Sequence, residues 1–536
     1  MASIAPKGKG RVMKPHRFPV LFVIVLAIGA LVYADHNQTS SSQTDTVTEH
    51  GLMPIASTQH AVSSSFYCAG GTATSNGAFD STIVIANPNP GPITTTVTVY
   101  PAAAPGDASG QAAVATLKPV TKQVPVGPRT RIGLRLANVQ PSPYVAALVE
   151  TNDPDIAVEH TIVGKQGVNV SPCASAPSSS WYLPTGTTTR DAHELLAIFN
   201  PFSADAVVDV TYQTDDGFRA PDGEQGLPIT AGHLRIVDVT ADVPRLEQLA
   251  AFVSARSGQV VVDRLQSFDG SDPNHPAGAA ATLGAPQAAP VWTFAHGSVS
   301  DSVGETIALV NPSDEQAQAQ LEVTLDDPAT NGVVDPIPVS VPARGYALVA
   351  MQDQTRVPKG IGHSVTVRST SGPAVVAERV LRAALASNRQ GYAPAIGAPL
   401  EATRWLFADG AAVPNVADVN LAVFNPSADQ STRVSVIAMA QGQPVEIDGL
   451  QNVEIPPGGR TALDVGQHIM RRDLTLIAET TLPVVVERNF LVSAGLSFAA
   501  GMPMSGTISV PARAAPTTTT TTTAPAPAPA PAPAPN

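Results

Sequence analysis

The chain repeats one pattern four times, about 110 residues apart, and this repetition constrains its fold more than any other feature. Each copy holds an apolar stretch that ends in Asn-Pro, and the asparagines are Asn87, Asn200, Asn311 and Asn425. Their spacings are 113, 111 and 114 residues. A pattern this regular predicts one small structural unit that is repeated in tandem.

Three further landmarks recur in the same order in every copy. An aromatic opener comes first, and it uses all three tryptophans of the chain: Phe66, Trp181, Trp292 and Trp405. A Pro/Gly turn with a basic residue follows the Asn-Pro. A valine-rich stretch that ends in an acid and a base comes last: Glu159-His160, Asp263-Arg264, Glu378-Arg379 and Glu487-Arg488. Adjacent residues on a strand point to opposite faces, so this acid and base are not expected to form a pair with each other.

Alternating apolar and polar residues predict strands rather than helices. Residues 207–213 and 319–325 alternate in this way directly after the Asn-Pro landmark. About six to eight strands per copy suit an all-β fold of four tandem Ig-like β-sandwich repeats. A β-propeller with two blades per copy is the alternative architecture.

The landmarks also divide the chain into segments. Short Ala/Pro-rich linkers between the copies predict a semi-rigid string of modules. The predicted segments are a basic N-terminus (1–17), a transmembrane helix or signal peptide (18–34), a Ser/Thr-rich tether (35–61), four β repeats (62–177, 178–288, 289–402 and 403–512) and a disordered Thr/Ala-Pro tail (513–536).

The N-terminal segment predicts export of the rest of the chain. Residues 18–34 carry no charge, and the 17 residues before them carry five basic groups. A helix of this length would be about 25 Å long, the lower limit for a bilayer span. We expect a single-pass membrane protein whose C-terminal body is extracytoplasmic, with its N-terminus in the cytoplasm. Cleavage after Ala34, which would give a secreted protein, is the alternative.

Charge and cysteine content narrow the classes of partner and compartment. The net charge of the chain is −13, and the part after residue 17 carries −18, so we expect no nucleic-acid partner. Cys68 and Cys173 lie near the two ends of the first repeat and are a disulfide candidate in an oxidising compartment. Two free, buried thiols are the alternative, and two cysteines alone rarely form a zinc site.

The landmark set resembles a repeat of secreted actinobacterial proteins. Residues Trp181 to Gly186, the Asn-Pro pairs at 200 and 425, and the Glu-Arg pairs at 378 and 487 are similar to the repeat of the DUF5719-type family, whose function is unknown. The resemblance spans about residues 62–510 and is weakest in the first copy, where Phe66 and His160 replace Trp and Arg. It implies a surface-exposed, membrane-linked protein without an assigned activity.

No motif in the chain predicts catalysis, and we expect no enzyme, no cofactor and no metal site. The acidic loop 269–274 has oxygen ligands for calcium but lacks the spacing of an EF-hand, so an ordinary polar loop is favoured. The recurring side chains are interpreted as structural rather than ligand-binding: Trp181, Trp292, Trp405, Asn87, Asn200, Asn311, Asn425, Arg264, Arg379 and Arg488.

The sequence therefore favours a non-catalytic envelope protein that serves as a scaffold or as a binding module for cell-wall glycan or protein. An enzyme or accessory protein that acts on envelope polysaccharide is the alternative, and it would require clustered carboxylates in a cleft. Any specific function should lie where the four copies differ.

Overall fold

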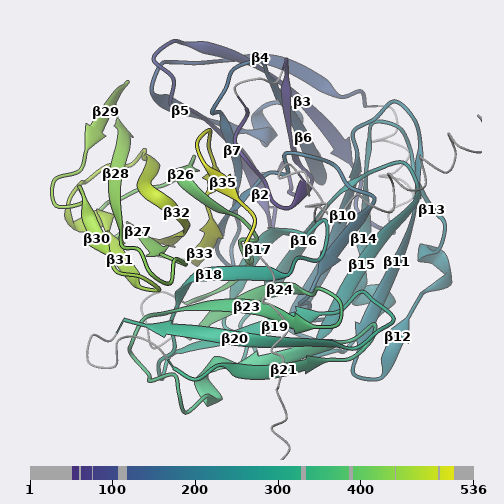
Figure 1. Ribbon diagram of the computed structural model, residues 1–536. Helices are drawn as coiled ribbons and strands as arrows, with labels where there is room; N and C mark the ends of the chain where they lie inside the picture. Colours follow the sequence, from purple (N-terminus) through teal and green to yellow (C-terminus); the bar gives the residue numbers. More distant parts are fainter. Residues whose placement is uncertain are drawn as a thin grey trace, which may run out of the picture. The chain divides into compact units, whose positions relative to one another are not determined.

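A computed structural model gives the fold of the chain (Figure 1). The structure describes residues 51–58, 62–74, 77–106, 117–326, 334–384, 390–440, 442–492 and 495–511. The predicted basic N-terminus, the apolar segment 18–34 and the tail 513–536 lie outside these residues.

The predicted all-β class is confirmed, because nearly all of the regular secondary structure of the described residues is strand. Both runs that were singled out for their alternation form strands, β11 (Ala206–Thr214) and β20 (Ala317–Leu325). Their side chains alternate without a break between buried and partly exposed. One face of each strand therefore packs into a core, as a period of two requires.

Each repeat forms two sheets that share one apolar core, and the strands of the four repeats are as follows. Repeat 1 contains β1 (Ser64–Cys68), β2 (Asp80–Asn87), β3 (Ile93–Ala102), β4 (Val120–Val126), β5 (Thr130–Arg135), β6 (Tyr144–Thr151), β7 (Ala157–Val163) and β8 (Val168–Pro172). Repeat 2 contains β9 (Ser180–Leu183), β10 (Ala192–Asn200), β11, β12 (Gly217–Arg219), β13 (Leu227–Ile229), β14 (His233–Asp238), β15 (Leu249–Ser257), β16 (Val261–Phe268) and β17 (Gly278–Leu283).

Repeats 3 and 4 follow the same plan. Repeat 3 contains β18 (Val291–Gly297), β19 (Val303–Val310), β20, β21 (Ile337–Val341), β22 (Tyr346–Ala350), β23 (His363–Ser371), β24 (Val376–Ala383) and β25 (Gly391–Ile396). Repeat 4 contains β26 (Glu401–Phe407), β27 (Ala417–Phe424), β28 (Thr432–Ala440), β29 (Gln443–Glu446), β30 (Val453–Ile455), β31 (Arg460–Asp464), β32 (Thr475–Val492), β33 (Gly495–Ala500), β34 (Met502–Pro503) and β35 (Ile508–Ser509). The long strand β32 pairs with β26 and β28 through its first half and with β27 and β33 through its second half.

Each of the two sheets in a repeat contains strands from both halves of the repeat's sequence. In repeat 1 one sheet has the order β1-β6-β3-β4 and the other has the order β5-β2-β7-β8. Repeat 3 has the same arrangement, with β18-β23-β20-β21 and β22-β19-β24-β25. A repeat is thus a sandwich-like pair of sheets rather than two consecutive propeller blades, since each sheet takes strands from both halves of the repeat.

The helices of the described residues are single turns. They are the α-helix α3 (Val239–Asp242) and the 3-10 helices η2 (Leu136–Asn138), η3 (Asp222–Glu224), η5 (Met351–Asp353) and η6 (Val465–Gln467). No helix in the part of the chain that the structure describes is long and apolar enough to cross a membrane. This finding corrects the predicted single-pass membrane localisation, because a span needs about 20 apolar helical residues. The localisation rested on residues 18–34, which lie outside the described residues.

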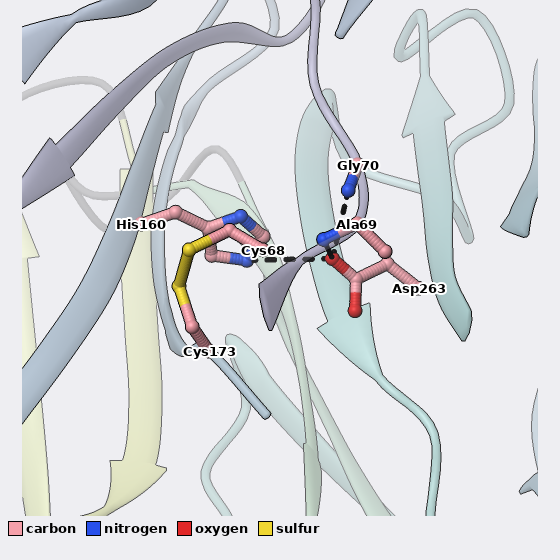
Figure 2. Close-up of a disulfide and its surroundings, with 6 residues drawn as sticks. All are labelled: Cys68, Ala69, Gly70, His160, Cys173 and Asp263. Carbon is pink, nitrogen blue, oxygen red and sulfur yellow. Dashed lines mark hydrogen bonds and ion pairs between the residues drawn. A yellow bond between two sulfur atoms is a disulfide. The ribbon is translucent and has the colours of Figure 1, made fainter. Parts of the chain in front are cut away.

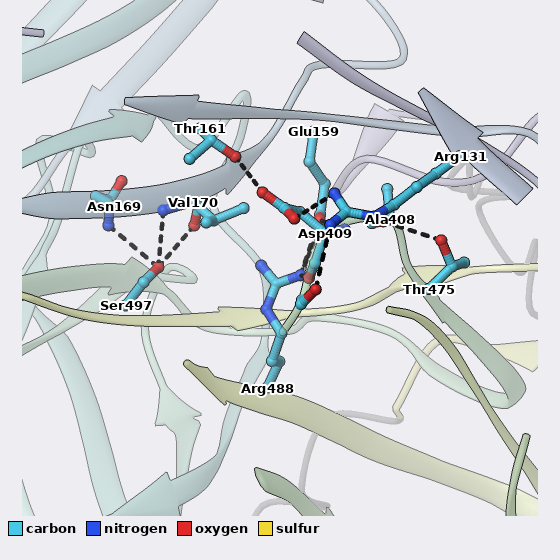
Figure 3. A network of polar contacts seen from close by, with 11 residues as sticks. Arg131, Glu159, Thr161, Asn169, Val170, Ala408, Asp409, Thr475, Arg488 and Ser497 are labelled. Carbon is cyan, nitrogen blue, oxygen red and sulfur yellow. Dashed lines mark hydrogen bonds and ion pairs between the residues drawn. The ribbon is translucent and has the colours of Figure 1, made fainter. Parts of the chain in front are cut away.

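The last strands of the four repeats meet one another in a closed cycle. β8 lies against β17, β17 against β25, β25 against β33, and β33 returns to β8. Ser497 of β33 makes this last contact by donating to the carbonyl of Val170 in β8 at 2.8 Å and accepting from its amide at 3.0 Å (Figure 3). The expected string of modules is therefore a ring, in which repeat 4 packs on repeat 1.

Glycine permits the close approach of these inner strands. A Cβ atom on Gly495, the first residue of β33, would lie 2.6 Å from the amide nitrogen of Val168 in β8. One on Gly278, the first residue of β17, would lie 2.7 Å from the amide nitrogen of Tyr392 in β25. Any larger residue at these two positions would push neighbouring repeats apart.

Part of the predicted tether packs against the ring. Leu52, Ile55 and Ala56 are buried. The amide of Ala56 donates to the carbonyl of Pro503 in repeat 4, and the amide of Ser57 donates to the carbonyl of Ile156 in repeat 1. This segment therefore connects the first and last repeats at the point where the ring closes.

Candidate functional site

The tryptophan openers are core residues that tie the two sheets of a repeat together. The indole nitrogens of Trp181, Trp292 and Trp405 donate to the carbonyls of Val260, Val375 and Val484 at 2.8, 2.7 and 3.1 Å. Each bond joins the opening strand to the start of the valine-rich strand in the other sheet. All three rings are almost fully buried, so none is available to stack on a sugar.

The recurring asparagines close the turn after each apolar strand. Asn311 donates to the carbonyls of Glu315 at 2.7 Å and Pro342 at 3.0 Å, and its side-chain oxygen accepts from the amide of Ser313. Asn87 and Asn425 make the same set of contacts in their repeats. Asn200 differs only in donating to the carbonyl of Ile229, the counterpart of Val341, instead of that of the following residue. All four are fully buried, and each satisfies backbone groups that proline and the turn leave without partners.

The acid and base of the fourth landmark reach two different neighbours. Arg264 of repeat 2 pairs with Glu378 of repeat 3 at 2.5 Å, and Arg379 of repeat 3 pairs with Glu487 of repeat 4 at 2.9 Å. Arg488 of repeat 4 pairs with Glu159 of repeat 1 at 2.8 Å. Because the two residues of each dipeptide point to opposite faces, every valine-rich strand contacts the repeat before it and the repeat after it.

Hydrogen bonds to the backbone complete these buried pairs. Glu159 also accepts from the amide of Asp409 at 2.7 Å, and Arg488 donates to the carbonyl of the same residue at 2.5 Å (Figure 3). The carboxylate of Asp409 accepts in turn from Arg131 at 2.5 Å and from the hydroxyl of Thr161. Buried charges paired in this way hold two repeats together. The Nε atoms of Arg264, Arg379 and Arg488 have no hydrogen-bond partner among the described residues, but the three side chains are fully buried and are not exposed to a ligand.

We call the contact between two neighbouring repeats a seam. The seam between repeats 1 and 2 has a different pair. His160 and Asp263 occupy the equivalent positions, 3.9 Å apart and fully buried (Figure 2). Asp263 accepts from the amides of Ala69 and Gly70 at 3.1 and 2.9 Å. Burial lowers the pKa of His160 to about 4 and raises the pKa of Asp263 to about 7, so this seam lacks the fixed opposite charges of the other three.

Cys68 and Cys173 form a disulfide beside this pair (Figure 2). The amide of Cys173 donates to the carbonyl of Val158, and Gly284, Gly397 and Gly501 make the same bond in the other repeats. A Cβ atom on Gly397 would meet the ring of Phe294 at 2.9 Å. At this place the other repeats pack a large apolar side chain against a glycine. In repeat 1 the disulfide takes the place of that contact.

The structure assigns packing roles to the recurring residues, so the candidate site must be sought where the repeats differ. A polar cleft of about 520 Å³ lies between repeats 2 and 3, and we call it the 2–3 cleft. It is lined by Glu247 and residues 273–276 of repeat 2 and by residues 300–304, Thr306, Gln352, Asp353, Lys359, Arg382 and Ala384 of repeat 3. The loop between β16 and β17 that forms one wall has nine residues, whereas the corresponding loop of repeat 1 has four.

His275 anchors this wall of the cleft. Its Nδ1 lies 2.9 Å from the carboxylate of Asp191, and its Nε2 lies 2.8 Å from the carboxylate of Glu247. The ring also packs against Phe268, with the ring centroids 5.0 Å apart. The two carboxylate contacts and the ring packing together fix the position of the loop.

Asp191, Asp272 and His275 could together hold a metal ion, since one ligand atom of each lies within 4.8 Å of the others. Asp272 belongs to the acidic loop 269–274 that the sequence offered as a weak calcium candidate. Both nitrogens of His275 are already bonded, and Asp269 and Asp272 accept from the amides of Ser271 and Asn274. These bonds favour the interpretation of an ordinary ordered loop.

The opposite wall of the 2–3 cleft carries both signs of charge. Lys359 donates to Asp301 at 2.8 Å, and this contact raises the pKa of Lys359 and lowers that of Asp301. The guanidinium of Arg382 lies over the ring of Phe268 at 5.8 Å. Sequence reasoning missed this cleft because its two walls come from different repeats. The unusual length of the loop in repeat 2 was the one available signal.

Comparison with known proteins gives one informative match. Residues 137–284 match a family model described as "Family of unknown function (DUF5719)". This match covers the end of repeat 1 and nearly all of repeat 2, less than a third of the chain, and supports a DUF5719-type family of unknown function. No curated protein matches the chain.

Among solved structures, a crystal structure of a β-glucuronidase from Bacteroides uniformis is similar to part of the chain at 11% identity, with a TM-score of 0.11. The similar region covers 44% of this chain and 27% of the glucuronidase chain. A likeness this weak carries no argument about fold or activity.

Proposed function

We propose that the protein is a non-catalytic, secreted binding scaffold of the cell envelope, and that the 2–3 cleft is its binding site. One observation carries the proposal: the recurring residues hold the ring together, whereas one wall of the 2–3 cleft is the nine-residue loop between β16 and β17, which is longer than the four-residue and seven-residue loops at the same place in repeats 1 and 3. The disulfide between Cys68 and Cys173 supports an oxidising, extracytoplasmic location. We also propose an Ig-like class for the individual repeats.

The lining of the cleft favours a polypeptide partner over a glycan. It contains carboxylates, a lysine, an arginine, two amides and a histidine, and no Trp or Tyr to stack on a sugar ring. Charged groups of both signs complement a polar segment of an envelope protein. Cell-wall glycan is the second candidate ligand, and the acidic body of the chain disfavours nucleic acid.

The same contacts disfavour a hydrolase that acts on envelope polysaccharide. Such an enzyme needs two free carboxyl groups, about 5–9.5 Å apart, on either side of the bond to be cleaved. In the 2–3 cleft Glu247 is bonded to His275 and Asp301 is bonded to Lys359. These two carboxylates therefore shape the walls, and Asp353 is the third carboxylate in the lining, one fewer than the two free groups that a hydrolase needs.

A substitution that fills the cleft tests the proposal. A Cβ atom on Gly304, in β19, would meet nothing closer than Gln352 at 3.8 Å, so Gly304→Phe projects a ring into the 2–3 cleft without disturbing the sheet. Gly91→Phe, at a partly exposed turn where a Cβ atom meets nothing within 4 Å, is the matched control.

The exported protein and both variants are immobilised and exposed to purified cell wall and, separately, to solubilised envelope proteins. We expect the native protein and Gly91→Phe to retain the same envelope protein and Gly304→Phe to lose it. Equal retention by the native protein and both variants would show that the 2–3 cleft is not the binding site. The absence of retention on both preparations rejects the binding function.

A further inference from the structure

Glu224 is a buried carboxylate without a partner, in a second pocket on the other side of repeat 2. Its side chain is only 4% exposed, and neither carboxylate oxygen accepts a hydrogen bond from any residue that the structure describes. The hydroxyl of Tyr212 is also buried and lies beside this carboxylate, where it favours the charged form of Glu224, but the two groups do not meet in hydrogen-bonding geometry. Burial raises the pKa of Glu224 to about 8, which reflects how poorly its surroundings accommodate a lone charge.

Repeat 4 shows that the fold does not require an acid at this position. Gln225 donates to the carbonyl of Val210 at 2.7 Å, and Gln451 makes the same bond to Val436 in repeat 4. This contact aligns Glu224 with Leu450, which is 3% exposed in the core of repeat 4. It also aligns Tyr212 with Ala438.

The exchange of leucine for glutamate costs stability. A buried polar group without a hydrogen bond destabilises a protein, whereas a buried leucine stabilises it. Glu224 destabilises repeat 2 at a position where repeat 4 has a stabilising leucine. A destabilising residue at such a position points to a function.

Glu224 lines a pocket of about 380 Å³ that also contains Asp238, Asp242 and one base, Arg235. Asp242 ends the short helix α3, is exposed, and lies beside Glu224, where its carboxylate is one of the groups that raise the pKa of Glu224. Asp238 already accepts from the amide of Ala241. The pocket therefore offers the oxygens of Glu224 and Asp242, with an excess of negative charge, to a ligand that enters from solvent.

We propose that Glu224 and Asp242 form a binding site for a hard divalent cation of the calcium type. Such cations take carboxylate oxygens and complete their coordination with water. A cation would satisfy both oxygens of Glu224 and neutralise the two neighbouring acids. With two protein carboxylates the affinity should fall in the range of extracellular calcium modules, a Kd of about 0.1–1 mM.

Terbium luminescence with the full chain tests this site, because Tyr212 lies next to Glu224 and transfers excitation energy to a bound Tb³⁺ ion. We expect saturable Tb³⁺ emission that Ca²⁺ displaces, and a rise in Tm of a few degrees with millimolar Ca²⁺. Glu224→Leu, which installs the residue of repeat 4, should lower the apparent affinity at least tenfold while Tm without cation stays equal or rises. Asp242→Asn should also lower the affinity.

Two controls separate the site from general ion binding. Asp448→Asn changes an exposed acid in the equivalent loop of repeat 4, and Asp272→Asn changes the acidic loop beside His275. Both should bind Tb³⁺ as the native protein does. Unchanged affinity in Glu224→Leu, or loss of binding in Asp272→Asn instead, would overturn the proposal. So would Tb³⁺ emission that Ca²⁺ does not displace.

Discussion

The seam between repeats 1 and 2 and the seam between repeats 3 and 4 solve the same packing problem with different chemistry. At the second, Arg379 donates to Glu487 and to the backbone of His296, and it lies over the rings of Phe294 and Phe498. At the first, His160 faces Asp263 at 3.9 Å, next to the Cys68–Cys173 disulfide. A covalent link inside repeat 1 thus accompanies the weakest ionic contact between repeats.

The largest effect should come from removing the base of a complete pair. Arg379→Met leaves Glu487 buried without its cation, and losses of this kind amount to about 3–5 kcal/mol. Denaturant unfolding monitored by tryptophan fluorescence measures the change. Adding Glu487→Met should recover part of the loss, because the isolated buried charge is then gone. A loss below about 1 kcal/mol for Arg379→Met would show that the pair does not hold the seam.

Removing the disulfide should have the next largest effect. Cys68→Ala with Cys173→Ala opens a loop whose ends are 105 residues apart, for which about 2–4 kcal/mol is typical. Cys68→Leu with Cys173→Gly installs the residues of repeat 2, Leu183 and Gly284, and should lose less. Thermal unfolding of both double variants compares them. Equal losses would mean that the disulfide does not substitute for the apolar contact.

The pH dependence of stability should separate the two residues of the His160–Asp263 pair. The folded pKa of Asp263, about 7, is raised from 3.8, so its contribution is present at low pH and is lost as pH rises towards 7. The folded pKa of His160, about 4, is lowered from 6.5, so its contribution is present above pH 6.5 and is lost as pH falls towards 4. The two trends cancel between pH 4 and 6.5.

Single substitutions should expose each trend. Relative to the native protein, Asp263→Asn should gain stability from pH 4 to 6.5, and His160→Gln should lose stability from pH 4 to 7. Each change should be on the order of 2 kcal/mol. Urea unfolding at several pH values measures the differences. Parallel curves for both variants and the native protein would contradict the assigned shifts.

The smallest effect should come from an exposed ion pair outside the seams. Arg344 and Asp314 are both exposed, and such pairs contribute about 0–1 kcal/mol. Arg344→Ala should therefore shift the free energy of unfolding by less than about 1 kcal/mol. A larger change would show that the seams are not the main ionic contribution to stability.

The Asn-Pro, tryptophan and alternating-strand features were predictable because each acts within its own copy. The Asn-Pro landmark gives a turn, and the runs around 207–213 and 319–325 give half-buried strands, by rules that need only neighbouring residues. The packing roles of the tryptophans follow from the same logic, since each bonds within its own repeat.

The features that depend on the arrangement of the repeats were not predictable. Adjacent residues on a strand point to opposite faces, which predicts that Glu487 and Arg488 do not pair with each other. Only the arrangement of the repeats in a ring shows that Arg488 pairs with Glu159, 329 residues away. The unpartnered Glu224 lies in a polar loop without a recognisable pattern. Alignment of Gln225 with Gln451 between repeats could have revealed it, because that register places Glu224 opposite a buried leucine.

Ring closure is the central claim, and a pair of double-mutant cycles tests it most directly. One cycle joins Arg488 and Glu159 across repeats 4 and 1, and the other joins Arg379 and Glu487 across repeats 3 and 4. A closed ring predicts similar coupling energies for both, on the order of 2 kcal/mol or more. A coupling energy of zero for Arg488 and Glu159, with the other cycle intact, would mean that the repeats form an open string.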